Sequence, residues 1–105
     1  MEVQSKYERV RLDFDKYINV VVRYYDVTRE QVLKSNQESC VDARYCVVYL
    51  LCDKYTDYEL SKSCALSKSC INKIRNKFKD KLCLNSFKSD FLEIKKLISS
   101  IECIN

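Results

Sequence analysis

Cysteine is the most reactive residue type in this chain, and its seven copies are accompanied by no histidine. No two cysteines stand in a Cys-x-x-Cys pair, the usual ligand spacing of a zinc site. Cys40, Cys46 and Cys52 lie six residues apart, which places successive ones about 240° apart around a helix. No helix face can therefore gather them as metal ligands. We expect reduced thiols that pack as small apolar side chains, with no metal and no other cofactor.

Catalytic constellations are also missing from the sequence. Without histidine the commonest general base is absent, and without glycine the phosphate-cradling loops of nucleotide enzymes cannot form. A Ser–Lys dyad is conceivable among so many serines and lysines, but no pair is singled out by its spacing. We therefore expect a binding protein and not an enzyme.

Basic side chains are concentrated in residues 61–81. This segment has seven lysine and arginine residues against Asp80 alone, a net charge of +6, whereas the rest of the chain carries −2. A basic cluster often means only the solvated face of a helix. On a helix-turn-helix, however, such a cluster is typical of a phosphate-binding surface. The interpretation depends on the elements that carry these residues.

The composition favours an all-α fold. The chain has 105 residues and no glycine or proline, which disfavours the tight turns of β-hairpins. We expect a compact bundle of about six helices that forms a single domain over residues 1–105. The longest uncharged run, residues 45–52, is too short to span a bilayer, and no signal peptide is recognisable. These features predict a cytoplasmic protein that does not enter a membrane.

Apolar periodicity and capping residues place the helices. Tyr7, Val10, Phe14, Tyr17 and Val21 recur at steps of three and four and predict an N-terminal helix at 1–24. A capping box of Thr28 and Gln31 opens a short helix that ends at residue 33, and a loop follows at 34–39. A strongly apolar central helix is expected at 40–54, and a C-terminal helix at 86–101. The seam of this last helix is formed by Phe87, Phe91, Ile94, Ile98 and Ile101.

Residues 57–82 fit a helix-turn-helix. Asp57 is the expected N-cap of its first helix, which ends near residue 63, and Ser67 is the expected N-cap of the second, which ends near residue 82. Residues 64–66 form the turn, where Ala65 takes the position usually held by glycine. The residues expected to hold the two helices together are Leu60, Leu66, Ile71 and Ile74.

The second helix of this pair is expected to bind DNA. With Ile71, Ile74 and Phe78 on its buried side, its polar residues face outward and its first turn enters the major groove, where asparagine can bond adenine. The DNA contacts predicted from this segment are Lys62, Ser67, Lys68, Ser69, Asn72, Lys73, Asn76 and Lys77.

Three short stretches, VTREQVL at 27–33, VDAR at 41–44 and YL at 49–50, resemble the C-terminal DNA-binding domain of the bacterial replication initiator DnaA, of the Trp-repressor-like superfamily. The resemblance covers roughly residues 17–80. It implies a DnaA-like core at 28–82, duplex DNA as the partner, and Arg44 of the Ala-Arg pair among the DNA contacts. The chain departs from the family in two stretches and has no ATPase module. Residues 34–38 stand for the basic loop with only Lys34, and Ser-Lys-Ser-Cys at 67–70 replaces the base-reading Asp-His-Thr-Thr signature.

The sequence thus predicts a duplex DNA-binding protein, a small regulator of transcription or accessory of DNA replication, encoded by a phage or mobile element and acting in the cytoplasm of a bacterial host. An alternative remains open, in which the same fold is a protein-interaction or structural module of a viral or polymerase assembly. We expect the C-terminal seam to pack on the N-terminal helix. A homodimer or a protein partner bound through either terminal helix is the competing possibility.

Overall fold

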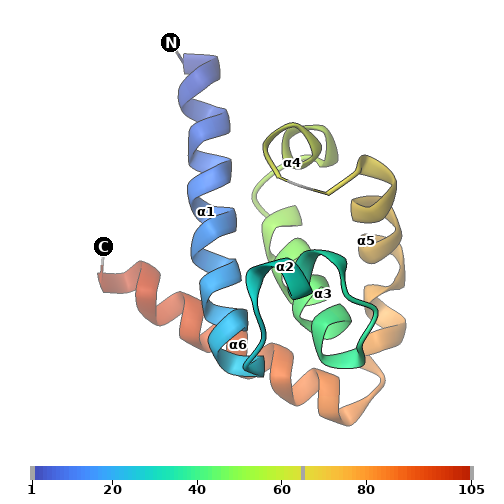
Figure 1. Cartoon of the computed structure of the whole chain (residues 1–105). Coiled ribbons are helices and arrows are strands. Elements are labelled where there is room, and N and C mark those ends of the chain that lie inside the picture. Colours follow the sequence, from blue (N-terminus) through green and yellow to red (C-terminus); the bar gives the residue numbers. More distant parts are fainter. Residues whose placement is uncertain (1, 65, 105) are drawn as a thin grey trace.

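The computed structural model describes residues 2–64 and 66–104, and the side chains of residues 7–64 and 66–102. Over these ranges the chain forms six α-helices and no β-strand, which confirms the predicted all-α class. The helices pack around one hydrophobic core (Figure 1). Their bounds are Glu2–Tyr25 (α1), Arg29–Lys34 (α2), Glu38–Cys52 (α3), Asp57–Ser63 (α4), Lys68–Leu82 (α5) and Asn85–Ile104 (α6).

The helix α1 presents its predicted apolar stripe to the core. The buried members of the stripe are Val10, Phe14, Tyr17 and Val21. The helix is terminated by the next residue, Asp26, whose φ of +55° lies in the left-handed region, and the Val27 N–H donates to the Val22 carbonyl oxygen over 3.1 Å. This termination usually uses glycine. In a chain without glycine, aspartate is one of the few residues that tolerate this conformation.

The next two helices begin close to where the sequence places them. The Thr28 hydroxyl accepts the N–H of Gln31, and the Gln31 side chain accepts the N–H of Thr28, so the predicted capping box is confirmed. The predicted loop at 34–39 is too long, because α2 includes Lys34 and α3 already begins at Glu38. The Ser35 hydroxyl accepts the N–H of Gln37 over 3.1 Å, and this local turn lets the chain reverse in three residues.

One predicted cap is wrong. The N-cap of α4 is Thr56 and not Asp57, because Thr56 and Glu59 form a second capping box. Asp57 is instead the first residue inside the helix, where its side chain is 10 % exposed and accepts a hydrogen bond from Arg75 of α5 over 2.7 Å. A carboxylate in the first turn also complements the helix dipole.

An aromatic cluster joins α3, α5 and α6 at the centre of the core. The rings of Tyr49 and Phe78 stack with their centroids 3.6 Å apart. Phe87 and Phe91 of α6 meet the Phe78 ring edge-on at 5.6 and 4.9 Å. Phe78 is fully buried, and aromatic contacts of this kind add to the free energy gained by burial alone.

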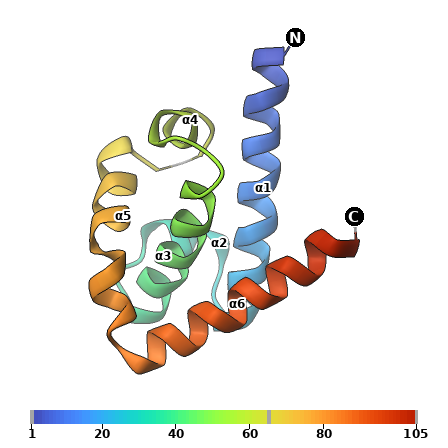
Figure 2. The same cartoon turned by 180° about the vertical axis from the view of Figure 1, so that it is seen from behind.

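The helix α6 runs along the base of the molecule, from the end of α5 past α1 (Figure 2). The prediction that its seam packs on α1 is therefore right for only part of the helix. Its first turns pack on α3 and α5 through Phe87 and Phe91, and their one described hydrogen bond to α1 is that of Asp90, which accepts from Tyr24 over 2.8 Å. The last member of the seam, Ile101, is 37 % exposed.

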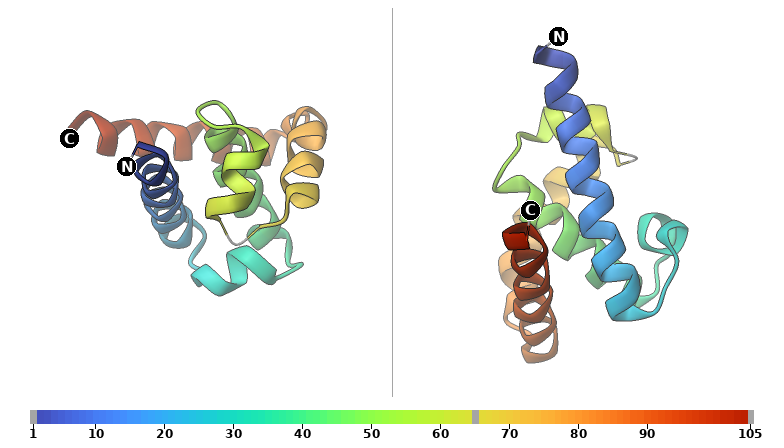
Figure 3. Two further views of the ribbon diagram at one scale, coloured as in Figure 1. Left: turned by 90° about the horizontal axis from the view of Figure 1, so that it is seen from above. Right: turned by 90° about the vertical axis from the view of Figure 1, so that its left-hand side faces the viewer.

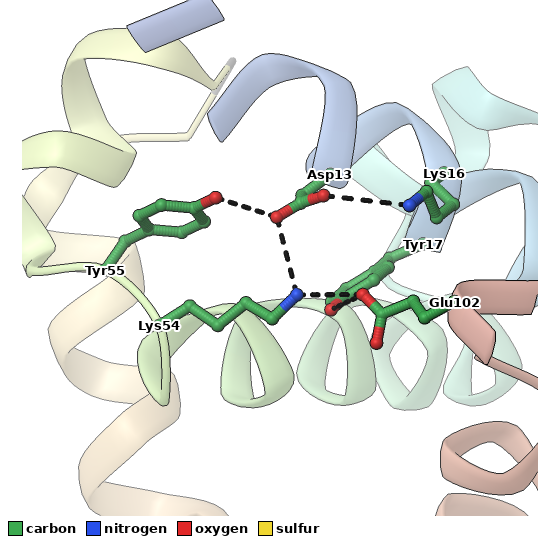
Figure 4. A network of polar contacts seen from close by, with 6 residues as sticks. All are labelled: Asp13, Lys16, Tyr17, Lys54, Tyr55 and Glu102. Atoms are coloured by element: carbon green, nitrogen blue, oxygen red, sulfur yellow. Dashed lines mark hydrogen bonds and ion pairs between the residues drawn. The ribbon is translucent and has the colours of Figure 1, made fainter. Parts of the chain in front are cut away.

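A polar network fastens the far end of α6 to α1 and to the chain after α3 (Figure 4). Lys54 lies 2.8 Å from Glu102 and 3.5 Å from Asp13, while Tyr17 donates to Glu102 over 3.0 Å and Tyr55 donates to Asp13 over 2.7 Å. The Lys54 ammonium, by hydrogen bonding to the Glu102 carboxylate, holds the pKa of that group below its usual range. The network thereby fixes the position of α6 by charge as well as by packing.

Candidate nucleic-acid interface

The helices α4 and α5 form the pair in which the sequence predicts a DNA-binding surface. Residues 64–67 connect them, and the two helices cross at a steep angle (Figures 1 and 3). The four residues expected to hold the pair together are all buried, namely Leu60, Leu66, Ile71 and Ile74. Ala65, expected in the turn, lies outside the described residues.

The helix α5 separates its buried and exposed residues as the sequence predicts. Ile71, Ile74 and Phe78 are buried, and the Ser67 hydroxyl caps the helix by accepting the N–H of Cys70 over 3.1 Å. The capping bond uses Ser67 as an acceptor and leaves its O–H as a donor. The predicted contact residues within α5 are all exposed: Lys68, Ser69, Asn72, Lys73, Asn76 and Lys77.

The charge at the start of α5 is positive. Its first turn contains no acidic residue, and residues 60–79 contain none at all. Lys68, Lys73 and Lys77 form no ion pair with any residue that the structure describes. The N-terminal end of the helix dipole adds to the field of these lysines. This face is therefore suited to phosphate or another anion.

Two basic side chains of residues 61–81 form ion pairs with carboxylates of other helices. Arg75 pairs with Asp57 of α4. Lys81 pairs with Asp42 of α3, and its ammonium lies 5.2 and 5.0 Å from the ring centroids of Tyr45 and Phe87. The Lys81 side chain is only 18 % exposed. The charge available to a ligand is therefore smaller than the +6 of the sequence segment suggests.

The far end of α5 is less suited to an anion. Asp80 is exposed and follows Asn76 by four residues, so the two lie on the same side of the helix. A carboxylate there would oppose a phosphate. The favourable surface is thus confined to residues 67–77, which include the first turns that a recognition helix presents to base edges.

The last two predicted contacts come from helices other than α5. Lys62 is in the last turn of α4, exposed, with its ammonium 5.4 Å from the ring centroid of Tyr58. Arg44 is on α3, where its Nε donates to the Val32 carbonyl oxygen and its Nη2 donates to that of Ser35, each over 2.7 Å. Arg44 therefore joins the end of α2 to α3, and the structure does not bring its guanidinium to the exposed face of α5.

A hydrogen bond between two of the predicted contacts was not foreseen. Asn76 Nδ2 donates to Asn72 Oδ1 over 3.2 Å on the exposed side of α5. The spacing of four residues is the signal that could have revealed it, because such residues are neighbours on a helix surface.

The described cysteines are free thiols and most are at least partly buried. Burial raises the pKa of the Cys46 and Cys64 thiols to about 12, and that of Cys52 to about 11. These thiols are therefore protonated near neutral pH and poor nucleophiles. Among the described residues, no group of three cysteine or carboxylate side chains is placed to hold a metal ion.

A groove away from α5 is lined by residues of α1 and α6. It has a volume of about 560 Å³, an apolar floor that includes Val20, Leu97 and Ile101, and Lys16 and Arg23 among its polar lining. No carboxylate, thiol or hydrogen-bonded polar pair is among its lining residues. The exposed lysine, serine and asparagine side chains of α5 therefore make a better candidate site than this groove.

Comparison with known proteins does not assign the chain to a family. No protein-family model matches the chain, and neither a curated protein nor a solved structure matches it significantly. Within the described part of the chain, no helix has both the length and the apolar character needed to cross a bilayer.

Proposed function

We propose that the protein binds duplex DNA and that α5 is the helix that enters the major groove. The observation that carries this proposal is the exposed face formed by residues 67–77 at the start of α5. There, lysine, serine and asparagine side chains stand together, with no acidic residue over 60–79 and no ion pair at Lys68, Lys73 or Lys77 among described residues. An ordinary solvated helix usually mixes charges of both signs, with pairs along one face.

The side chains on this face divide into two roles. Lys68, Lys73 and Lys77 neutralise phosphates and release the counterions condensed on them. Asn72 and Asn76, in the same two turns, are the side chains that can read a base edge. The proposal makes α4 the helix that crosses the DNA backbone, which is the usual place of the first helix of such a motif.

The serines and the last turn of α4 complete the proposed interface. The hydroxyls of Ser67 and Ser69 stand at the N-terminus of α5, where helix ends commonly bind phosphate. Lys62 supplies a further phosphate contact from α4. We leave Arg44 out of the interface, because both of its described hydrogen bonds go to backbone carbonyl groups.

The order of the elements supports a DnaA-like origin for the module. A capped short helix precedes a helix that carries Ala43 and Arg44, and the crossed pair α4 and α5 follows. We propose a binding protein without enzymatic activity, a small regulator of transcription or accessory of DNA replication. It would be encoded by a phage or mobile element and would act in the cytoplasm of a bacterial host.

One observation favours the alternative, a protein-interaction module of a viral or polymerase assembly. The stretch that stands for the family's basic loop, residues 34–38, has Lys34 as its single basic residue, and the nearby Arg44 is engaged with backbone. A loop with one basic residue offers few positively charged side chains that could enter the minor groove. Under this alternative the protein would not bind duplex DNA even at low salt.

Charge reversal on α5 tests the proposal. Fluorescence anisotropy with labelled random duplexes of about 20 base pairs measures the affinity of the purified protein at low salt. Lys73→Glu with Lys77→Glu replaces two phosphate contacts by repulsion, and we expect a loss of affinity of at least about tenfold. Both lysines are exposed and free of described ion pairs, so the fold should persist, which circular dichroism can verify.

The matched control is Lys95→Glu with Lys96→Glu. This pair makes the same change in net charge at exposed positions of α6, one turn or more after Phe87 and Phe91, which contact Phe78 of α5. We expect the control to lower affinity much less than the α5 variant. Equal losses in the two variants would indicate an effect of net charge alone. Absence of binding by the unaltered protein would favour the interaction module.

A further inference from the structure

The groove lined by α1 and α6 leaves apolar surface open to water in a concave place. Its apolar lining includes Val20, Leu97 and Ile101, and the last two are 40 % and 37 % exposed. The volume of the groove is about 560 Å³, within the range of small-molecule sites, which is roughly 300–1,000 Å³. An apolar group that covered these side chains would gain free energy by removing them from water.

The polar lining of the groove consists of donors that the fold leaves largely unused. Arg23 forms no ion pair or side-chain hydrogen bond with any residue that the structure describes, and the same is true of the Asn19 amide. These two residues are four positions apart and are therefore neighbours on the surface of α1. Lys16 has one described ion pair, a long contact of 3.9 Å with Asp13.

Carboxylates beside the groove are engaged elsewhere. Asp90 accepts a hydrogen bond from a tyrosine of α1, while Asp13 and Glu102 both lie beside the Lys54 ammonium. Glu93 lines a different depression, together with two lysines of α6. The charges that line the groove itself are thus positive, which favours a ligand with an anionic group.

The size of the groove favours a small molecule over another protein. Eight described residues line it, whereas a stable protein–protein interface takes about 20–30 residues a side. A second copy of the chain also lacks a complementary helix, since α1 has five basic and four acidic residues and α6 has three of each. On α1 the lining covers residues 16–24, a length of about 12 Å at 1.5 Å per residue, which suits an extended chain of medium length.

We propose that this groove binds the anion of a medium-chain fatty acid. The planar guanidinium of Arg23 donates two parallel N–H bonds to the carboxylate, and the Asn19 amide donates a third. The hydrocarbon chain covers Val20, Leu97 and Ile101 and bridges α1 to α6. None of these residues is on α5, so the inference does not rest on the proposed DNA binding.

A set of matched ligands tests the assignment of head group and chain. Isothermal titration calorimetry of the purified protein with octanoate is carried out near pH 7, where the carboxyl group is ionised. Octanoate should bind about 5- to 10-fold more tightly than octanol, because a hydrogen bond to a charged group is stronger than one to a neutral group. Octylammonium should bind more weakly than octanol. Acetate keeps the head group without the chain and should show no measurable binding.

Substitutions in the groove test where the two parts of the ligand lie. Arg23→Gln should weaken octanoate binding by about 5- to 10-fold and leave octanol binding unchanged. Arg11→Gln makes the same change at an exposed position of α1 outside the groove and should alter neither. Leu97→Gln should weaken octanoate and octanol alike, whereas Leu92→Gln, at an exposed position of α6 outside the groove, should not. All four side chains are exposed, so the variants should remain folded.

Amide NMR spectra locate the ligand. Shift changes on adding octanoate should be concentrated in residues 16–24 and 97–101. The proposal is overturned if octanoate does not bind, if octanol binds as tightly, if Arg23→Gln and Arg11→Gln have equal effects, or if the shift changes spread over the whole surface. A dimer that Leu97→Gln dissociates would assign the groove to a second copy instead. Binding to anionic phospholipid vesicles without binding of free octanoate would assign it to a membrane surface. None of these outcomes bears on duplex binding, which is measured separately.

Discussion

Phe78 is the residue whose replacement most directly tests the packing that supports α5. Its ring is fully buried, stacks on Tyr49, and meets Phe87 and Phe91 edge-on. Phe78→Ala removes this ring and leaves a cavity where three helices meet, at a cost of about 3–5 kcal/mol. A domain of this size has a free energy of unfolding of about 5–15 kcal/mol, so the variant should be close to unfolding.

A graded substitution makes the prediction measurable. Phe78→Leu keeps most of the apolar volume and loses the aromatic contacts, which should lower the free energy of unfolding by about 1–3 kcal/mol. Urea titration followed by circular dichroism measures it. The control is Leu92→Ala, which truncates a side chain that is 54 % exposed on α6 and should change stability by less than about 0.5 kcal/mol. If Phe78→Leu and Leu92→Ala lower stability equally, the aromatic cluster does not hold α5 as described.

Three other substitutions test the interior and its charges by the same titration. Cys46→Ser should cost about 1–3 kcal/mol, because a hydroxyl is costlier to bury than the thiol that it replaces. An unchanged midpoint would contradict the burial. Glu102 has a lowered pKa beside Lys54, so its contribution is present above its ordinary pKa of about 4.3 and is lost as the pH falls below it. Glu102→Gln should therefore be less stable than the unaltered protein by about 0.2–1 kcal/mol near pH 7, and the difference should vanish near pH 3. Asp57→Ala should cost about 1–3 kcal/mol through its bond to Arg75, and adding Arg75→Ala should cost little more if the two residues act as a pair.

The parts of the fold that follow from local rules could be predicted from the sequence. The caps at Thr28 and Ser67 depend on residues within three positions, and the buried face of α5 depends on the helical period. The correct N-cap of α4 could also have been predicted from the sequence. Thr56 and Asp57 are both good N-cap residues, but only Thr56 has a glutamate three positions later to complete the box.

The parts that depend on distant residues could not be predicted in this way. Arg44 binds backbone oxygens 12 and 9 positions earlier, a contact that exists only because α2 folds back against α3. Arg75 and Lys81 count as free cations in the sequence, yet each pairs with a carboxylate of another helix. The charge pattern therefore overestimated the unpaired positive charge of this segment, whereas the exposed face of α5 was foreseen residue by residue.

The salt dependence of duplex binding is the most direct test of the central claim. The exposed lysines of the proposed interface, Lys62, Lys68, Lys73 and Lys77, allow about three or four phosphate contacts once the two paired cations are excluded. The logarithm of the association constant should then fall against the logarithm of NaCl concentration with a slope of about −2.7 to −3.6. Lys68→Ala should reduce the magnitude of this slope by roughly one. A slope near zero, or no binding at about 50 mM NaCl, would contradict the assignment of α5 as a DNA-binding helix.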